Sequence, residues 1–394
     1  MLQPAEVTVA RRWAMLATST FAQAAAAVTI HGPAFLIPYL HERRGLSLAE
    51  AGLVAAAPTV GVMLTLVAWG WVVDHRGERF ALMTGLGGTA AAGLASTQVE
   101  GTVALGVVLL LAGVAAASTA SASGRVVVGW FPAERRGLAM GIRQMAQPVG
   151  VGVGAITIAV LAHTHGLAAA LAVPTALAAV AAVVVAVVVL DPPRPDRTLA
   201  VAPNPYRADG FLTRIHGVSV LLVVPQFLVW TFSLVWLVQD RGWDPAAAGT
   251  AVAVAQLLGA LGRIAAGQLS DMVRSRMRPL LWVAVAASVT MGLLALAAWL
   301  DWAVAVLLMA VATAVTVADN GLAFTAVAER AGPFWSGRAL GVQNTAQYLT
   351  ASAVPPVTGL VVAEWGFAAA FGMAALFPLV AVALVPVRDE HPLS

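Results

Sequence analysis

The chain has 394 residues, of which 60% are hydrophobic and only 10% are charged, so it has too few polar side chains to cover a soluble protein of this length. It contains no cysteine, which excludes a disulfide framework and any cysteine-based metal or redox site. The net charge is +3, and the 22 basic residues, all arginine, are distributed by topology and do not indicate nucleic-acid binding.

Twelve hydrophobic blocks, each roughly 20 residues long, follow one another along the sequence. A helix of about 20 residues crosses the hydrocarbon core of a bilayer, so each block predicts a transmembrane helix. The predicted fold class is therefore an all-α membrane protein with 12 transmembrane helices. In chain order the predicted helices span residues 13–40, 49–73, 80–97, 101–129, 137–162, 166–190, 212–238, 246–270, 279–299, 302–327, 337–362 and 367–387.

The arginines are distributed unevenly between the two sides of this arrangement. Fourteen lie in the N-terminus, the even-numbered connections and the C-terminus, and Arg214 and Arg338 lie in the first turn of helices that start on the same side. Only Arg43, Arg44 and Arg241 lie in odd-numbered connections. Cytoplasmic segments carry an excess of arginine, so both termini and the central connection are predicted to be cytoplasmic. The expected location is the cell membrane, and the use of arginine without lysine suggests a bacterium with a GC-rich genome.

Residues 191–211 divide the chain into two halves. The stretch "DPPRPDRTLAVAPNPYRADG" is rich in proline and charge, and it predicts a cytoplasmic linker between six-helix bundles at 1–190 and 212–394. On either side of it, "RRGLSLAEAG" and "DRGWDPAAAG" lie at an offset of 197 residues. Parallel six-helix repeats place a substrate site near the midplane, where the halves meet.

Two further matches follow in the same order. "GWVVDHRGER" (70–79) lies over "GQLSDMVRSR" (267–276) at the offset of 197, and this brings Asp74 onto Asp271. "GLAMGIRQMAQ" (137–147) lies over "GRALGVQNTAQ" (337–347) at an offset of 200. Three ordered matches at a nearly constant offset indicate two pseudo-symmetric bundles rather than a chance likeness of glycine- and alanine-rich helices.

The motif "GWVVDHRGER" resembles the glycine–aspartate–arginine–glycine–arginine signature between the second and third helices of the major facilitator superfamily, with Gly70, Asp74, Arg76, Gly77 and Arg79 at the matching positions. "GRIAAGQLSD" (262–271) resembles its weaker counterpart in the eighth helix. The resemblance implies alternating access by a transporter that works as a monomer. It also implies a cavity lined by the first, fourth, seventh and tenth helices.

The repeated helix start predicts a pair of conformational locks. A helix N-terminus exposes unpaired N–H groups and a partial positive charge, so it attracts a carboxylate. Asp74 is expected to dock at Gly337, with Ser336 as the helix cap, and Asp271 at Gly137. The alternative is that the motif only caps helices and fixes topology. The predicted gate residues are Gly70, Asp74, Arg76, Gly77, Arg79, Arg125, Gly137, Asp271, Arg276 and Gly337.

Three ionisable residues lie deep inside the predicted helices. At a rise of 1.5 Å per residue, Arg143 lies about 9 Å below its helix end, Arg263 about 12 Å and Asp319 about 13–15 Å. A static ion pair that holds the bundle together is one interpretation. The other is an anion site in which Arg263 binds substrate, Arg143 assists, and Asp319 pairs with the arginine and releases it on protonation.

Polar and aromatic side chains in the helices complete the predicted site. His31 is a second candidate for proton coupling, because histidine titrates near neutral pH. Hydrogen bonding between helices explains several of these residues nearly as well as substrate binding does. The predicted substrate-binding residues are Arg263, Arg143, His31, Gln23, Gln147, Gln226, Trp230, Asn320, Gln347 and Tyr348.

The predicted function is proton-coupled secondary transport of a small organic anion, with no cofactor and no metal. Arg263 resembles in position the substrate arginine in the eighth helix of oxalate–formate antiporters and monocarboxylate porters, which implies a monocarboxylate. Alternatives are a proton-driven exporter of drugs or metabolites, and a transport-dead sensor. The sequence contains no Walker A loop, no "HExxH" and no "GxSxG", so an ATP-driven pump or an intramembrane hydrolase is not expected.

Overall fold

The computed structural model describes residues 7–193 and 203–390, and every regular element within these ranges is a helix. The predicted linker at 191–211 falls partly on residues 194–202, which lie outside the described ranges. Ten helical segments of the described chain are long and apolar enough to cross a membrane.

The helices of the first half are α1 (Val9–His31), η2 (Gly32–Leu36), α2 (Ile37–Arg44), α3 (Leu48–Arg76), α4 (Glu78–Ser96), α5 (Thr102–Trp130), α6 (Ala133–Gln144), α7 (Ala146–His165) and α8 (Leu167–Val188). Those of the second half are η3 (Pro205–Arg207), α9 (Phe211–Gln239), α10 (Pro245–Val273), α11 (Met277–Trp299), α12 (Val304–Val315), α13 (Asp319–Ala331), α14 (Ser336–Leu384) and η4 (Val387–Asp389).

Two places account for the difference between ten spans and the twelve predicted. Helix α4 has 19 residues and is not among the ten, because charged residues at its start and its several glycines lower its hydropathy. Helix α14 has 49 residues, but its backbone is non-helical at Gly366, where φ is 80° and ψ is 174°. The sequence predicts two helices there, 337–362 and 367–387, which meet at this kink.

One span of the second half is broken where its counterpart is continuous. Helix α5 runs without interruption from Thr102 to Trp130, whereas α12 ends at Val315 and α13 begins at Asp319. Aspartate and asparagine favour helix starts because their side chains compete for backbone N–H groups. The break therefore places Asp319 and Asn320 at a helix start inside a membrane-spanning segment.

The chain folds into two compact units that do not follow its halves strictly. Unit 1 consists of Met1–Phe131, Met145–Ala202 and Ala331–Thr345, and unit 2 of Pro132–Gln144, Pro203–Arg330 and Ala346–Ser394. Each unit thus includes one segment from the opposite half of the chain. Unit 1 contains the first turns of α14, and unit 2 contains α6. These are the two copies of the repeated helix start.

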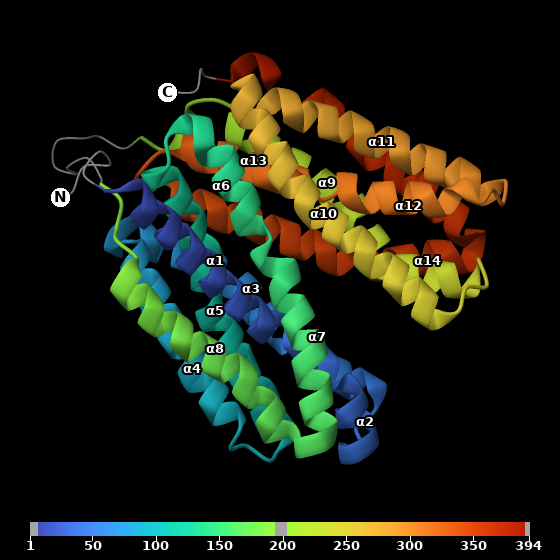
Figure 1. Cartoon of the computed structure of the whole chain (residues 1–394), viewed down its shortest axis with the longest axis horizontal. Coiled ribbons are helices and arrows are strands. Elements are labelled where there is room, and N and C mark those ends of the chain that lie inside the picture. Colours follow the sequence, from blue (N-terminus) through green and yellow to red (C-terminus); the bar gives the residue numbers. More distant parts are fainter. Residues whose placement is uncertain (1–6, 194–202, 391–394) are drawn as a thin grey trace. The chain divides into compact units, whose positions relative to one another are not determined.

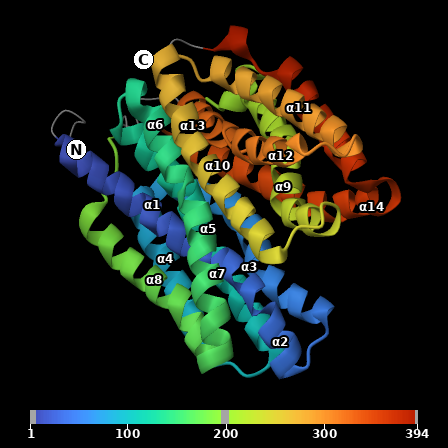
Figure 2. The ribbon, with the colours of Figure 1, turned by 45° about the vertical axis from the view of Figure 1, so that its right-hand side comes forward.

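Unit 1 is built around α5, which packs against α3, α4 and α1, while α8 lies beside α4 (Figures 1 and 2). Small residues allow the closest approach. A Cβ on Gly61 would lie 2.2 Å from the carbonyl oxygen of Leu110, and one on Gly113 would lie 2.0 Å from that of Pro58. Glycine at both positions therefore lets the α3 and α5 backbones touch, as is common between membrane helices.

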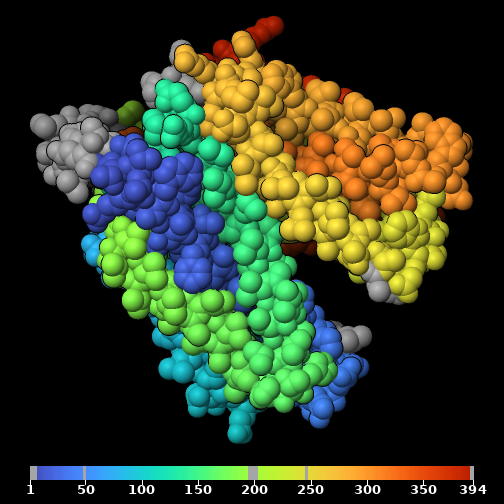
Figure 3. Space-filling model, viewed as in Figure 1, coloured from blue at the N-terminus to red at the C-terminus, as the bar shows by residue number. Residues whose placement is uncertain are grey.

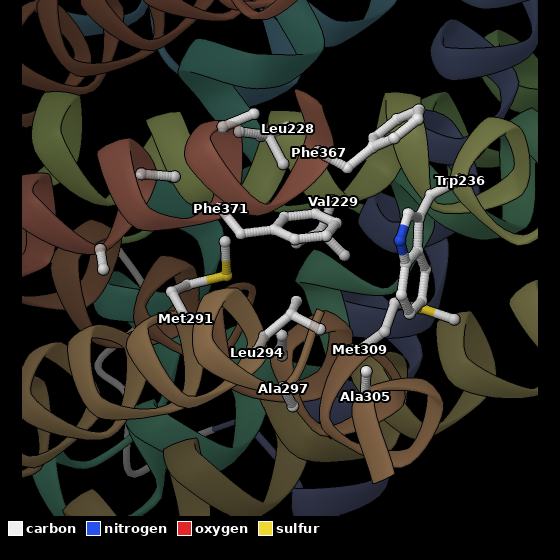
Figure 4. Close-up of a cluster of buried hydrophobic side chains, with 14 of the residues drawn as sticks. Leu228, Val229, Trp236, Met291, Leu294, Ala297, Ala305, Met309, Phe367 and Phe371 are labelled. Carbon is white, nitrogen blue, oxygen red and sulfur yellow. The ribbon is translucent and has the colours of Figure 1, made fainter. Parts of the chain in front are cut away.

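Unit 2 has a large apolar core between α9, α11, α12 and α14 (Figure 4). The rings of Trp236 and Phe371 meet edge to face with centroids 5.6 Å apart, and Met291 and Met309 fill the space around them. On another side of the unit, α6 packs along α10, which is visible in Figure 3 as a turquoise segment against yellow. The core fixes the helices, and α6 brings Arg143 into the same unit as Arg263 and Asp319.

Candidate functional site: two carboxylate locks and a buried charge cluster

Asp74 docks at the start of α14, as the sequence predicts. Its carboxylate is buried and accepts hydrogen bonds from the backbone N–H groups of Gly337 (2.8 Å) and Arg338 (3.1 Å). The Arg338 side chain adds a third bond, from Nε at 2.8 Å. Two unpaired N–H groups of a helix start and one guanidinium thus neutralise a carboxylate that burial would otherwise destabilise.

Asp271 makes the equivalent contact in unit 2. It accepts hydrogen bonds from the N–H groups of Gly137 (2.9 Å) and Leu138 (2.8 Å), and Nη1 of Arg276 lies 2.6 Å from the same carboxylate. The arginine comes from a different position in the two copies. Leu138 stands where Arg338 stands in the other copy, so Arg276 at the end of the motif supplies the charge.

The glycines explain why the helix start is repeated. A Cβ on Gly337 would lie 2.5 Å from the carbonyl oxygen of Gly70 and 2.8 Å from Oδ1 of Asp74. A Cβ on Gly137 would lie 2.3 Å from the carbonyl oxygen of Gly267 and 2.8 Å from Oδ1 of Asp271. Any larger residue would push the carboxylate away from the N–H groups that it binds.

Alanine at Gly337 is therefore expected to destabilise unit 1 by about 2 kcal/mol, since its Cβ meets backbone atoms that cannot rotate away. The measurement is thermal unfolding of the purified protein in detergent. Gly292→Ala is the matched control, because a Cβ at that helical glycine has no neighbour within 4 Å. Equal melting temperatures for the two variants would contradict the packing argument.

Ser336 does not act as the predicted cap. It is the first residue of α14, and its hydroxyl oxygen accepts a hydrogen bond from Nη1 of Arg125 at 2.7 Å. Nη1 of Arg125 also donates to the carbonyl oxygen of Pro333, and its Nε donates to Glu78. Arg125, predicted as a gate residue, thus ties α4 to the segment that leads into α14.

An ion pair with the charges exchanged between the two elements occupies the corresponding place in unit 2. There Arg276, just before α11, contacts Glu329 on α13 at 3.2 Å, and its Nη2 donates to the carbonyl oxygen of Ala133 at 2.5 Å. Burial opposes the charge of Arg276, but the carboxylates of Glu329 and Asp271 outweigh it and raise the pKa of Arg276 above its ordinary value. Glu78 and Glu329 were not among the predicted site residues.

The remaining motif residues of the first copy do not contact the Asp74 dock. Arg76 lies over the ring of Phe80 at 5.4 Å, and Nη2 of Arg79 donates to the carbonyl oxygen of Ala186 at 2.5 Å. Gly77 has a φ of 100°, and a Cβ there would lie 2.7 Å from the carboxylate of Asp191. These residues hold the start of α4 against the end of α8 instead of forming the lock.

Two carboxylates at the ends of the halves, which sequence reasoning missed, complete this arrangement. Asp191 accepts a hydrogen bond from the backbone N–H of Arg79 at 2.8 Å. Glu390 accepts hydrogen bonds from the backbone N–H groups of Arg276 and Met277, the latter at 3.2 Å. The two acids are 199 residues apart, close to the repeat offset, so the internal repeat could have revealed them.

Substituting Asp74 by asparagine is expected to slow transport about fivefold while leaving substrate binding within about twofold. Loss of the charge weakens the dock by roughly 1 kcal/mol and shifts the population away from the locked state. The measurement is initial flux in proteoliposomes beside equilibrium binding. Asp301→Asn is the control, since that carboxylate is exposed. Unchanged flux, or loss of binding, would contradict a gating role.

The three deep charges come together in unit 2. Arg143 on α6, Arg263 on α10 and Asp319 on α13 are 2%, 4% and 0% exposed. Helices α6 and α10 touch, because a Cβ on Gly141 would lie 2.6 Å from the carbonyl oxygen of Arg263. Helix α13 joins them at Gly321, where an added Cβ would lie 3.5 Å from the Cα of Gly141. The three helices therefore converge around Arg263.

Arg263 and Asp319 interact electrostatically without forming a salt bridge. Their charges stabilise each other, but no ion pair within 4.0 Å joins them among the described residues. Nη1 of Arg263 donates to the carbonyl oxygen of Gln144 at 2.7 Å, while its Nε has no hydrogen-bond partner. Neither carboxylate oxygen of Asp319 accepts a hydrogen bond of normal distance and angle. Buried polar atoms in this state are rare and call for a functional explanation.

Arg143 is held differently. Its guanidinium lies over the ring of Phe324 at 5.6 Å, and its Nε donates to the sulfur of Met140 at 3.1 Å. The face of an aromatic ring attracts a cation electrostatically. Arg143 thus adds positive potential to the same unit. It contacts an aromatic ring and a thioether sulfur, whereas Arg263 binds a carbonyl oxygen.

A chain of three amides continues from the charge cluster. Nδ2 of Asn320 donates to Gln226 at 3.1 Å, and Nε2 of Gln347 donates to Asn320 at 3.2 Å. Trp230 is half-buried and meets Phe227 edge to face at 5.3 Å. Tyr348, also half-buried, follows Gln347 on α14. Seven of the ten predicted substrate residues therefore belong to unit 2.

The other three lie in unit 1 and form two separate contacts. Nε2 of Gln147 lies 3.5 Å from Nε2 of His31, which joins α7 to α1. Gln23 accepts a hydrogen bond from the hydroxyl of Ser123 at 3.3 Å, which joins α1 to α5. Ser123 was not predicted. His31 and Asp319, the two candidates for proton coupling, thus lie in different units.

Comparison with known proteins gives a consistent picture. A sequence profile of the Major Facilitator Superfamily matches residues 17–355. The chain is 47% identical over 387 residues to the uncharacterized MFS-type transporter Rv2994 of Mycobacterium tuberculosis, which covers 98% of this chain and 87% of that protein. The mycobacterial relative agrees with the GC-rich source that the arginine usage suggests.

Solved structures share the fold at low sequence identity. The fucose:proton symporter FucP of E. coli has a TM-score of 0.77 at 14% identity, covering 95% of this chain and 98% of that one. The human organic anion transporter MFSD10 has a TM-score of 0.67 at 18% identity, covering 96% and 100%. Proteins of this family are multi-pass membrane transporters for small molecules and not enzymes. The chain belongs to the major facilitator superfamily.

Proposed function

We propose that the protein is a secondary active transporter that moves a small, monocarboxylate-like anion across the cytoplasmic membrane by alternating access, coupled to protons. The observation that carries this proposal is the buried pair Arg263 and Asp319, which is held by converging helices but not joined by a salt bridge. The fold is shared with a sugar symporter and an organic anion transporter, so the choice of substrate rests on these side chains.

The guanidinium of Arg263 suits a carboxylate substrate. A guanidinium keeps its charge when buried and offers two parallel N–H groups that match the two oxygens of a carboxylate. Arg263 has an unsatisfied Nε, and the cation of Arg143 lies in the same unit. An arriving anion would compensate the positive charge that Asp319 only partly balances.

Asp319 provides a mechanism for proton coupling. When ionised, it competes with the substrate for the charge of Arg263, and when protonated it is neutral and leaves the arginine to the anion. Proton binding and anion binding then favour each other by the same free energy, as linkage requires. Symport follows, since the loaded state carries one proton and one anion together.

The two carboxylate locks supply the conformational part of the mechanism. Asp74 and Asp271 each bind a helix start that the chain contributes from its other half. Breaking such a dock costs a few kcal/mol, small enough to be repaid by differential substrate binding in a two-state cycle. Twelve helices in two six-helix bundles, a monomeric state and cytoplasmic termini complete the proposal, supported by the internal repeat and the distribution of arginine.

The experiment that tests the proposal is uptake by proteoliposomes of the purified protein. Labelled lactate and propionate are supplied outside under an inward proton gradient, and a cationic dye is loaded inside in a parallel assay. Accumulation of a carboxylate that collapses with a protonophore is expected. Dye efflux without carboxylate uptake would replace the proposal with the exporter alternative, and binding without flux under every gradient would indicate a sensor.

A further inference from the structure

The amide chain in unit 2 differs from ordinary hydrogen bonding between membrane helices. It links three elements, α9 through Gln226, α13 through Asn320 and α14 through Gln347. Both polar atoms of the central Asn320 are used, one as donor and one as acceptor. Asn344, by contrast, donates to the carbonyl oxygen of Leu340 in its own helix at 2.8 Å, where it needs no partner from elsewhere.

The two ends of this chain are open. Within the described structure, the second polar atom of Gln226 and that of Gln347 take part in no hydrogen bond, yet neither atom is sealed from solvent. One open end is a donor and the other an acceptor. Reversing all three amides exchanges these roles, and one donor and one acceptor remain available in either orientation.

The chain adjoins the charge cluster. Asn320 follows Asp319 directly, so their Cα atoms are about 3.8 Å apart. Trp230 lies one helical turn after Gln226, on the same face of α9, and is half-buried. The amide chain, with its one open donor and one open acceptor, and the ring of Trp230 therefore lie beside the residues proposed to bind the carboxylate.

We infer that the transported anion carries a hydroxyl group in addition to its carboxylate, and that the Gln226–Asn320–Gln347 chain binds this hydroxyl. The inference rests on the proposed function, in which Arg263 binds the carboxylate. A hydroxyl both donates and accepts, so it satisfies the open ends of the chain. An unsubstituted carboxylate displaces water from the same amides without replacing their hydrogen bonds, and a site of this kind discriminates against it.

The test compares pairs of acids matched in carbon number: lactate with propionate, and 3-hydroxybutyrate with butyrate. In proteoliposomes of the full-length protein, the specificity ratio for the hydroxy acid over its partner is expected to be about 3- to 10-fold, the range of one or two neutral hydrogen bonds. In Asn320→Leu this ratio falls to about one. Gln226→Leu and Gln347→Leu give the same readout if the first variant does not fold.

Asn344→Leu is the matched control, since it removes an amide from α14 that bonds only within the helix; its ratio stays at the wild-type value. Equal uptake within each pair by the wild-type protein, with both acids still sensitive to Arg263→Gln, would overturn this inference and leave the anion site intact. A complete lack of uptake for all four acids would overturn the proposed function itself.

Discussion

Replacing Arg263 by glutamine is expected to lower carboxylate uptake about 100-fold, which corresponds to ~2.7 kcal/mol of lost transition-state binding. Glutamine is shorter than arginine, carries no charge and lacks the guanidinium, so both the Coulomb attraction and the fork geometry disappear. The variant also loses the hydrogen bond that Nη1 donates to the carbonyl oxygen of Gln144.

Initial uptake of labelled lactate in proteoliposomes measures this effect. Arg263→Lys keeps the charge without the fork and is expected to fall between wild type and Arg263→Gln. Arg214→Gln is the control, because Arg214 forms a partly exposed ion pair with Asp389 at 2.7 Å, away from the cluster. Wild-type uptake by Arg263→Gln would remove the anion site from the mechanism.

The docks of Asp74 and Asp271 could be predicted because their determinants are local. A carboxylate just before a helix connection and a glycine at the start of a distant helix are both visible in the sequence, and the repeat offset pairs them. Electrostatics at a helix start then predicts which groups meet. The structure confirms both contacts at 2.8 to 3.1 Å.

The pairs that support these docks could not be predicted. Glu78 with Arg125 and Arg276 with Glu329 occupy equivalent places with reversed charges, so the internal repeat offers no matching residue types. Such a pair is defined only by the distance between helices, which periodicity does not encode. The same holds for the break at 316–318, since no proline marks it and propensity alone is a weak guide inside a membrane.

Depth along a helix predicted part of the candidate site. Counting residues from the helix ends placed Arg143, Arg263 and Asp319 at similar depth, and the structure brings all three into unit 2. The count gives no rotation about the helix axis, so it could not show that Arg263 and Asp319 stop short of a salt bridge. Nor could it separate His31 from Asp319, which now lie in different units.

Asp319 forms no salt bridge with Arg263, so its proton can be exchanged without breaking an ion pair. We therefore expect the protonation state of Asp319 to have a large effect on transport. Asp319→Asn is expected to abolish accumulation driven by a proton gradient, with a fall of about tenfold in the uptake ratio at a gradient of one pH unit. Asparagine resembles the protonated acid in shape and charge. Arg263 therefore remains available to the anion at every pH.

The sign of the pH effect distinguishes this mechanism from a structural role. In the wild type, acidification protonates Asp319 and releases Arg263, so lactate affinity should rise as the external pH falls. In Asp319→Asn the affinity should be high and independent of pH, and exchange of labelled for unlabelled lactate should persist without any gradient. Asp301→Asn serves as the control, because the carboxylate of Asp301 is exposed. A variant that keeps gradient-driven accumulation would show that the proton travels elsewhere, whereas one that loses exchange as well would mark Asp319 as structural.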